Sequence, residues 1–195
     1  MHTTATKQRL IQSFLKLASK EGVGNISLSR LANENNITKA TIFCHFSSRD
    51  ELIKNMYAYC DTIRTQQEIS LEGDARAVLD RLVRHWIEFY TIAPVSYFYR
   101  IVSEQQYTDN LAKEKSHALW SMFYGQSQVV LETLSDSHRL EIEELDLATI
   151  MFSSTIKHFI DEEILTGSDE DDWQIDRFLS KFCTLFTSSP EKGPQ

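Results

Sequence analysis

The amino-acid sequence predicts an all-helical protein, about nine helices in all, in which a small helix-turn-helix head precedes a larger helical body. Apolar residues recur every three to four positions along most of the chain, and strand-like alternation is absent. Helix breakers are few, with 6 Gly and 3 Pro in 195 residues. A hydrophobic content of 42% suffices for a core. We therefore expect a head over 1–55, a larger helical body over 56–188, and a polar tail over 189–195.

The composition argues against several other classes of protein. No apolar run is long enough to span a membrane and the polar first residues are unlike a signal peptide, so we expect a cytoplasmic protein. The three cysteines, Cys44, Cys60 and Cys183, lack metal-ligand spacing and are interpreted as packing residues. Motifs for phosphate binding, acyl transfer or zinc catalysis are absent, so we expect neither an enzyme nor a cofactor or metal.

Charge is distributed unevenly along the chain. Residues 1–55 hold eight basic and four acidic side chains, a net charge of +4, whereas the remainder holds twelve against twenty-four, a net charge of -12. A cationic head on an anionic body suits a protein that approaches phosphates at one end only. Chance unevenness is the alternative explanation.

The first two helices of the head are predicted from periodicity and capping residues. Residues 7–21 form an amphipathic helix that ends at Gly22 and Gly24. Its apolar face comprises Leu10, Ile11, Phe14, Leu17 and Ala18. Ser27 is expected to cap a second helix, which ends at Asn35 and Asn36, residue types that tolerate a positive φ.

A short third helix follows a tight turn closed by Ile37. Thr38 is its predicted N-cap, and it runs from Lys39 to about His45. Ser48 and Glu51 form a capping-box pattern that begins a fourth helix, predicted to continue to about Ser70. This arrangement has the spacing of a helix-turn-helix, in which a turn of three to four residues joins two helices.

The residues of this segment resemble the TetR family of transcriptional regulators. The resemblance covers about residues 8–56 and depends on the runs ISLSRLA (26–32), ITKATIFCHF (37–46) and RDEL (49–52). Two positions differ from the family pattern: Asn36 replaces a turn glycine, and Phe43 replaces a tyrosine whose hydroxyl often binds a phosphate. The resemblance implies a homodimeric DNA-binding regulator with an effector cavity in its body.

The predicted DNA-binding residues lie around the third helix, although ordinary exposed helix positions would explain several of them equally. Lys39 can reach a guanine acceptor in the major groove or merely a phosphate. His45, by the resemblance, and Arg49, by its place at a helix N-terminus, are assigned to phosphates. Lys54 is interpreted as solvated. The full set is Ser27, Thr38, Lys39, Ala40, Thr41, Phe43, His45 and Arg49.

Five further helices are predicted in the body. Gly73 and Asp74 precede the fifth, Pro94 begins the sixth, and Thr108-Asp109 begins a long seventh that Gly125 is expected to bend. The last two, about 141–165 and 173–186, are separated by Thr166-Gly167-Ser168 and the acidic run 169–172.

Two binding surfaces are predicted in the body. Aromatic residues crowd between positions 86 and 124, where they would line a cavity for a largely apolar effector or simply pack the core. The predicted effector set is Trp86, Phe89, Tyr90, Tyr97, Phe98, His117, Trp120, Phe123 and Tyr124. The last helix is apolar around much of its circumference, so we expect it either to meet a second copy or to be wholly buried. The predicted dimer set is Ile150, Ser154, Lys157, Phe178, Phe182 and Leu185.

Together these features predict a sequence-specific transcriptional regulator. Its expected partners are double-stranded operator DNA with a palindromic sequence, a second copy of the chain, and a small effector that releases a repressor from the operator. The alternative is a helical ligand-sensing or protein-interaction dimer of the same fold without sequence-specific DNA binding.

Overall fold

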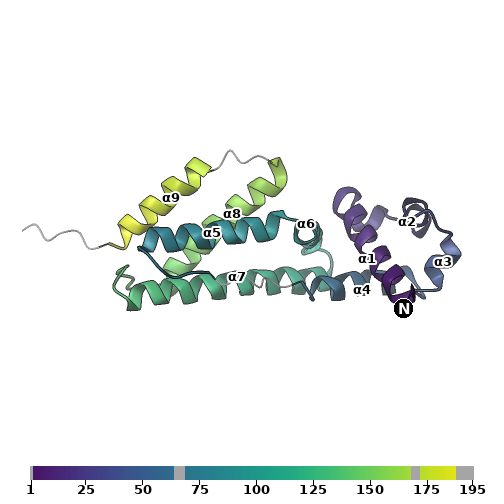
Figure 1. The fold of residues 1–195 in the computed structure, drawn as a ribbon, viewed down its shortest axis with the longest axis horizontal. Coiled ribbons are helices and arrows are strands. Elements are labelled where there is room, and N and C mark those ends of the chain that lie inside the picture. Colours follow the sequence, from purple (N-terminus) through teal and green to yellow (C-terminus); the bar gives the residue numbers. More distant parts are fainter. Residues whose placement is uncertain (1, 64–68, 168–171, 188–195) are drawn as a thin grey trace, which may run out of the picture. The chain divides into compact units, whose positions relative to one another are not determined.

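The computed structural model describes residues 2–63, 69–167 and 172–187, with side chains from residue 5 onward. Over these residues the chain forms nine α-helices and one short 3-10 helix, with no β-strand, so the predicted all-helical fold is confirmed (Figure 1). The helices are α1 (His2–Glu21), η1 (Val23–Asn25), α2 (Leu28–Glu34), α3 (Lys39–Phe43), α4 (Arg49–Cys60), α5 (Ala75–Thr91), α6 (Val95–Gln105), α7 (Asn110–Asp136), α8 (Leu145–Thr166) and α9 (Asp172–Leu185). The predicted separator residues 168–171 and the predicted tail over 189–195 lie outside the described residues.

Several helix ends differ from the prediction. The fourth helix was expected to reach Ser70 but ends at Cys60, beyond which the amides of Thr62 and Ile63 bond carbonyls three residues back and the Thr62 hydroxyl donates to the Tyr59 carbonyl (2.6 Å). Residues 64–68 of the predicted helix lie outside the described residues. Pro94 stands one residue before α6 and not within it. α8 begins four residues later than predicted, at Leu145.

The helices divide into two compact units whose boundaries differ from the predicted boundary at residue 55. The head unit comprises Met1–Gln66 and Ile92–Ser116, and the body unit comprises Gln67–Thr91 and His117–Gln195. Sequence position alone places α6 in the body, yet α6 packs against α1 and therefore belongs to the head unit.

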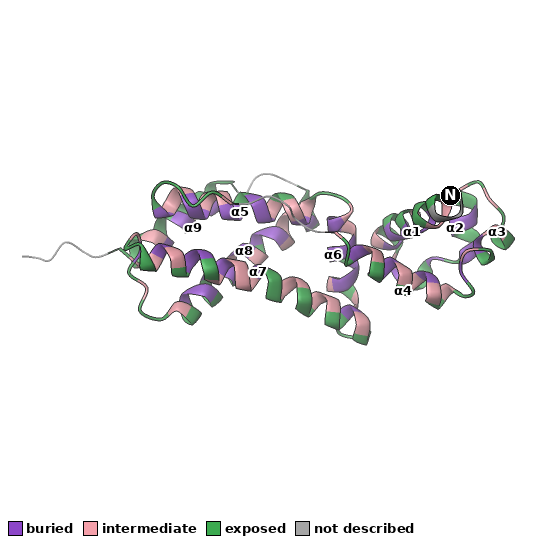
Figure 2. Cartoon of the chain, turned by 60° about the horizontal axis from the view of Figure 1, so that its bottom comes forward, coloured by how far each residue is buried: buried purple, intermediate pink, exposed green. Residues whose placement is uncertain are grey.

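The head unit is built on the apolar face of α1, which packs against α2, α4 and α6. The predicted face residues of α1 are all buried. Figure 2 shows the helices coloured by the burial of their residues. Tyr57 of α4 meets Phe98 of α6 edge to face, with ring centroids 6.0 Å apart. The Lys115 ammonium pairs with the Asp61 carboxylate at 2.7 Å, which joins the end of α4 to the start of α7. The head therefore includes more than its helix-turn-helix.

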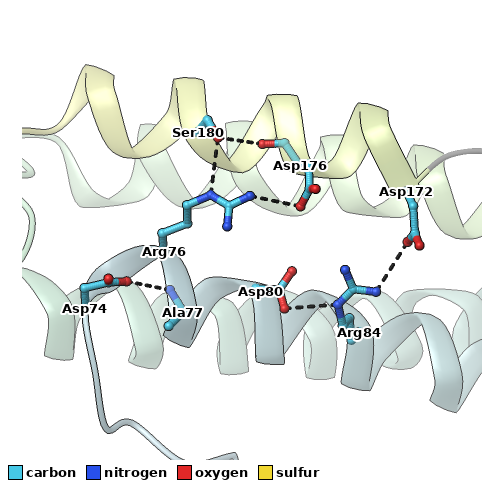
Figure 3. A network of polar contacts seen from close by, with 8 residues as sticks. All are labelled: Asp74, Arg76, Ala77, Asp80, Arg84, Asp172, Asp176 and Ser180. Carbon is cyan, nitrogen blue, oxygen red and sulfur yellow. Dashed lines mark hydrogen bonds and ion pairs between the residues drawn. The ribbon is translucent and has the colours of Figure 1, made fainter.

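The body unit is organised around α5, which packs against α8 and α9. Figure 3 shows the polar side of the α5–α9 contact, where Arg76 bonds Asp176 (2.9 Å) and Ser180 (3.3 Å), and Arg84 bonds Asp172 (3.3 Å). These side chains are exposed, so the ion pairs are expected to fix the position of α9 more than to stabilise the fold. Within the described residues, no helix has both the length and the apolar character that a membrane crossing requires.

Burial corrects the interpretation of the cysteines. Cys60 is buried, which raises the pKa of its thiol to about 12, and Cys183 is half-buried. Cys44 is exposed, so the prediction that all three are packing residues is wrong for Cys44. The reason is its place at the end of α3, where the helix turns its outer side to solvent.

Candidate nucleic-acid interface

The helix-turn-helix is shaped by two capping hydrogen bonds and one left-handed turn residue that its sequence predicts. The Ser27 hydroxyl accepts from the Arg30 amide at 3.1 Å and caps α2. Asn36 has a φ of 54°, the left-handed conformation that the turn requires. The Thr38 hydroxyl accepts from the Thr41 amide at 3.2 Å and caps α3. Ser27 and Thr38, both predicted to bind DNA, therefore each have a structural role.

The short helix α3 has a buried and an exposed side. Ile42 is fully buried, and Phe46, just beyond the helix, is 1% exposed. Lys39 and Ala40 are exposed, and Phe43 is 48% exposed. Phe43 directly follows Ile42, so its side chain lies on a different side of the helix from the core-facing Ile42.

The exposed side of α3 presents an ordered group of side chains. The Lys39 ammonium lies 5.8 Å from the centroid of the Phe43 ring, a cation–π contact. The hydroxyls of Thr38 and Thr41 are 2.9 Å apart and share a hydrogen bond. His45 is half-buried beside Phe46, with ring centroids 6.5 Å apart. This surface combines a cation, hydroxyls and an apolar ring, which are the groups that recognise base edges and phosphates.

Arg49 has an intramolecular function that the sequence did not indicate. Its Nε donates to the Ile26 carbonyl at 3.0 Å, and one terminal nitrogen donates to the Val23 carbonyl. Both carbonyls belong to nearly fully buried residues in the segment between α1 and α2. Arg49 therefore ties the start of α4 to this segment, and its predicted phosphate contact remains a prediction.

Other charges in the head are also internally compensated. Arg30 pairs with Glu34 (2.8 Å) and Glu21 (3.2 Å), which raises the pKa of its guanidinium. Hydrogen bonds from the side chain and the backbone amide of Ser47, each 2.6 Å long, lower the pKa of Glu51. The predicted capping box is therefore half correct: the Ser48 hydroxyl accepts from the Glu51 amide (3.1 Å), but the Glu51 carboxylate binds Ser47.

The predicted effector residues fall into both units. Tyr97 and Phe98 belong to the head unit, whereas the other seven belong to the body unit. Six of these seven form one aromatic cluster between α5 and α7: Trp86, Phe89, Tyr90, Trp120, Phe123 and Tyr124. His117 is exposed at the start of the body segment of α7. The structure therefore brings most, but not all, of the predicted set together.

The aromatic cluster contains polar atoms that the sequence pattern did not reveal. Trp86 meets Phe123 nearly at right angles with centroids 5.1 Å apart, and the Tyr90 hydroxyl donates to the Leu119 carbonyl at 3.2 Å. Trp86 is fully buried, yet its indole N–H has no hydrogen-bond partner among the described residues. Gln126 and Ser127 on α7 also carry buried oxygens without partners there.

Some of the predicted dimer residues are exposed and others are buried within the chain. Ile150 and Ser154 are exposed on α8, Leu185 is 67% exposed on α9, and the Lys157 ammonium pairs with Asp161 at 2.6 Å. Phe182 is 1% exposed because it packs against Phe152 at 5.2 Å within its own chain. Its assignment to the dimer surface is wrong on this ground. Phe178 is half-buried, and its ring contacts Phe152, Phe159 and Phe182.

The exposed apolar residues of α8 form a stripe that the prediction captured only in part. Leu147 (48% exposed), Ile150 (49%) and Met151 (41%) follow helical spacing on one side of α8, and we call them the α8 stripe. Leu147 and Met151 were missed because α8 is rich in apolar residues on every side, so periodicity alone does not distinguish its core side. No group of three or more His, Cys, Asp or Glu side chains suited to a metal ion occurs in the part of the chain that the structure describes.

Residues 10–56 match the family model of bacterial regulatory proteins of the tetR family. Among curated proteins, the HTH-type transcriptional regulator AcrR of Shigella flexneri is 24% identical over 87 residues, which cover 43% of this chain. The match spans only 40% of that relative's length.

Solved structures of similar fold extend over nearly the whole chain. A TetR-family regulator from Cytophaga hutchinsonii has a TM-score of 0.71 at 14% identity, covering 97% of this chain and 98% of its own. A TetR regulator from Agrobacterium tumefaciens has a TM-score of 0.71 at 16% identity, covering 94% of each. A regulator from Saccharomonospora viridis, solved in complex with choline, has a TM-score of 0.61 at 17% identity, covering 92% of this chain and 94% of its own. At these identities the likeness concerns the fold.

Proposed function

We propose that the chain is a repressor that binds a palindromic operator as a homodimer, because residues 10–56 match the model of the tetR family and the fold of the whole chain is similar to that of TetR-family structures. A small effector would release it from the operator. The observation that carries this proposal is the exposed side of α3, where Lys39 and Phe43 are uncovered while Ile42 is fully buried.

The chemistry of this side suits the major groove. A lysine can donate to the O6 and N7 acceptors of guanine, and an apolar ring or a threonine methyl can contact a thymine methyl. Lys39 supplies the ammonium, Phe43 the ring and Thr41 a methyl and a hydroxyl. Ala40 has a small side chain that would allow the helix backbone to approach the base edges. Because Thr38 caps α3 through its own hydroxyl, the start of the helix is held in place before DNA arrives.

Dimerisation through the α8 stripe would supply the second head. One recognition helix buries too little surface for tight specific binding, and two heads related by a two-fold axis read a palindrome. The stripe exposes three large apolar residues side by side, a surface that a second copy of the same helix can cover. Half-sites would then lie about 34–36 Å apart.

We infer that the effector binds in the body unit, because the aromatic cluster lies there. Clusters of aromatic walls with a few polar groups are typical of small-molecule sites. A protein of similar fold, the Saccharomonospora viridis regulator, was solved with the small molecule choline. We therefore expect an effector to bind between α5 and α7.

The test is a selection of DNA sequences from a random library with the full chain, followed by binding measurements on the enriched sequence. A palindrome is expected. Lys39→Ala should bind the enriched operator and its single-base variants with more nearly equal affinities, losing about 1–3 kcal/mol of discrimination. Lys181→Ala, an exposed lysine on α9, is the matched control and should behave as the wild type. Enrichment of no sequence would favour the alternative, a ligand-sensing dimer without sequence-specific DNA binding.

A further inference from the structure

Phe43 is an exposed aromatic residue on the outer side of α3. Between residues 5 and 60, all of which the structure describes, it is the one large apolar side chain that is exposed, at 48%. Its neighbours Lys39 and Ala40 are exposed as well, whereas Ile42 holds the helix to the core. A single exposed apolar residue is common on protein surfaces, so the significance of this ring depends on the group beside it.

The group beside the Phe43 ring is the Lys39 ammonium. The two residues are four positions apart on α3, and the ammonium lies 5.8 Å from the ring centroid, within the range of a cation–π interaction. A lysine side chain has a flexible four-carbon stem, and this contact favours the rotamers that keep the ammonium beside the ring. The ammonium has three N–H donors, so those that face away from the ring can still bind an acceptor. Phe43 therefore positions the Lys39 donors next to its own ring.

The two groups match two different features of the major groove. The ammonium can donate to O6 and N7 of guanine. The Phe43 ring has no polar atom with which to bond a phosphate or a polar base edge, and the large apolar group that the groove presents is the C5-methyl of thymine. Guanine and thymine belong to different Watson–Crick pairs, and successive pairs are about 3.4 Å apart. Because the ammonium and the ring centroid are 5.8 Å apart, the two groups reach neighbouring base pairs.

We propose that Lys39 and Phe43 together read a guanine and a thymine on adjacent base pairs of each half-site. Phe43 contacts the thymine methyl group and positions the Lys39 ammonium for the guanine, so one aromatic ring determines the specificity at both positions. This inference rests on the proposed function, in which α3 enters the major groove, and it names the pair of bases that α3 recognises.

The test uses the operator that is enriched with the full chain, with the thymine beside the guanine replaced by deoxyuridine in one half-site. This replacement removes the methyl group and leaves base pairing intact. The wild type should bind the uracil operator about fourfold more weakly, which is the effect of one buried methyl group. Phe43→Ala should bind the two operators alike. Tyr107→Ala, which removes an 87% exposed ring from the same unit, is the control and should keep the wild-type ratio.

A second pair of variants separates the two roles of the ring. Phe43→Leu keeps an apolar side chain but removes the aromatic face, so the weaker binding of the uracil operator should persist. Its preference for guanine over adenine should fall about two- to fivefold, the range of an exposed cation–π interaction. Lys39→Ala should show the converse, losing the guanine preference while still binding the uracil operator more weakly. Because Phe43 is exposed and its ring bonds no phosphate, its variants should match the wild type in urea denaturation and in the salt dependence of operator binding.

The proposal is overturned if the enriched half-site contains no adjacent guanine and thymine, or if the wild type binds the thymine and uracil operators alike. It is equally overturned if Phe43→Ala still binds the uracil operator more weakly, as it would if the Thr41 methyl contacted the thymine, or if Phe43→Leu keeps the full guanine preference. Enrichment of no sequence would contradict the proposed function. A tightly bound operator that shows none of these effects would contradict this inference alone.

Discussion

Replacement of Arg49 separates a structural role from a DNA-binding role. The Arg49 guanidinium donates to the carbonyls of Ile26 and Val23, and so joins the N-terminus of α4 to the segment between α1 and α2. Arg49→Ala removes both hydrogen bonds; the Ile26 carbonyl loses its arginine donor, while the Val23 carbonyl keeps a bond from the Ile26 amide at 3.4 Å. We expect a loss of head stability first, and a change in DNA binding only as its consequence.

The size of this loss follows from the two hydrogen bonds. A hydrogen bond to a charged group contributes about 1.5–3 kcal/mol, and partial hydration of the freed carbonyls offsets some of it, so about 2–4 kcal/mol is expected. The free energy of unfolding of a small unit falls by about 2 kcal/mol per molar urea, so the urea concentration at the midpoint of head unfolding should fall by about 1–2 M. The measurement is urea denaturation of the full chain, followed by hydrogen exchange of the amides in α2 and α4.

Two further variants distinguish a structural role of Arg49 from a phosphate contact. Arg49→Lys keeps the charge but cannot reach both carbonyls with one planar group, and Arg49→Gln keeps one donor but loses the charge. If Arg49 is structural, all three variants are less stable and the salt dependence of operator binding keeps the wild-type slope. A structural role for Arg49 is refuted by the opposite result. In that case Arg49→Ala unfolds at the same urea concentration as the wild type and lowers the salt-dependence slope of operator binding by about 0.9 per head, while Arg49→Lys retains the slope.

Two other perturbations test the dimer surface and the recognition helix. Ile150→Glu places a charge in the α8 stripe, so it should convert the proposed dimer to monomers in sedimentation experiments. Val129→Glu, at an exposed position of α7, should leave the proposed dimer intact. A dimeric Ile150→Glu chain would exclude the stripe as the interface. Thr38→Ala should destabilise the head by about 1 kcal/mol in urea denaturation, since it removes the cap of α3, and Thr38→Ser should restore the stability. Equal stability of the alanine and serine variants would show that the cap contributes nothing.

Local signals in the sequence predicted much of the head. Ser27, Thr38 and Ser48 each cap the helix assigned to them, and Asn36 has the positive φ expected of it. Such features are predictable because a cap depends on a side chain and an amide two or three residues away. The end of α4 at Cys60 is different, because the helical pattern continues in the sequence beyond the point where the turn begins.

Features that depend on contacts distant in sequence were not predictable. The Arg49 side chain bonds carbonyls more than twenty residues away, and a helix-terminal arginine equally suggests a phosphate ligand. Phe182 and Ile150 are both apolar residues on apolar helices, yet one is buried and the other is exposed. Periodicity reports that a side of a helix is apolar, but it does not report which neighbour covers that side.

The two-segment composition of the head unit has a consequence for protein engineering. Because α6 packs against α1 while lying more than seventy residues after it, the chain crosses from one unit to the other three times. A chimaera joined after residue 60 would leave the α6-facing side of α1 and the edge of Tyr57 uncovered. Exchange of operator specificity between relatives should therefore succeed by grafting the surface residues of α3, or by transferring 92–116 together with the N-terminal segment.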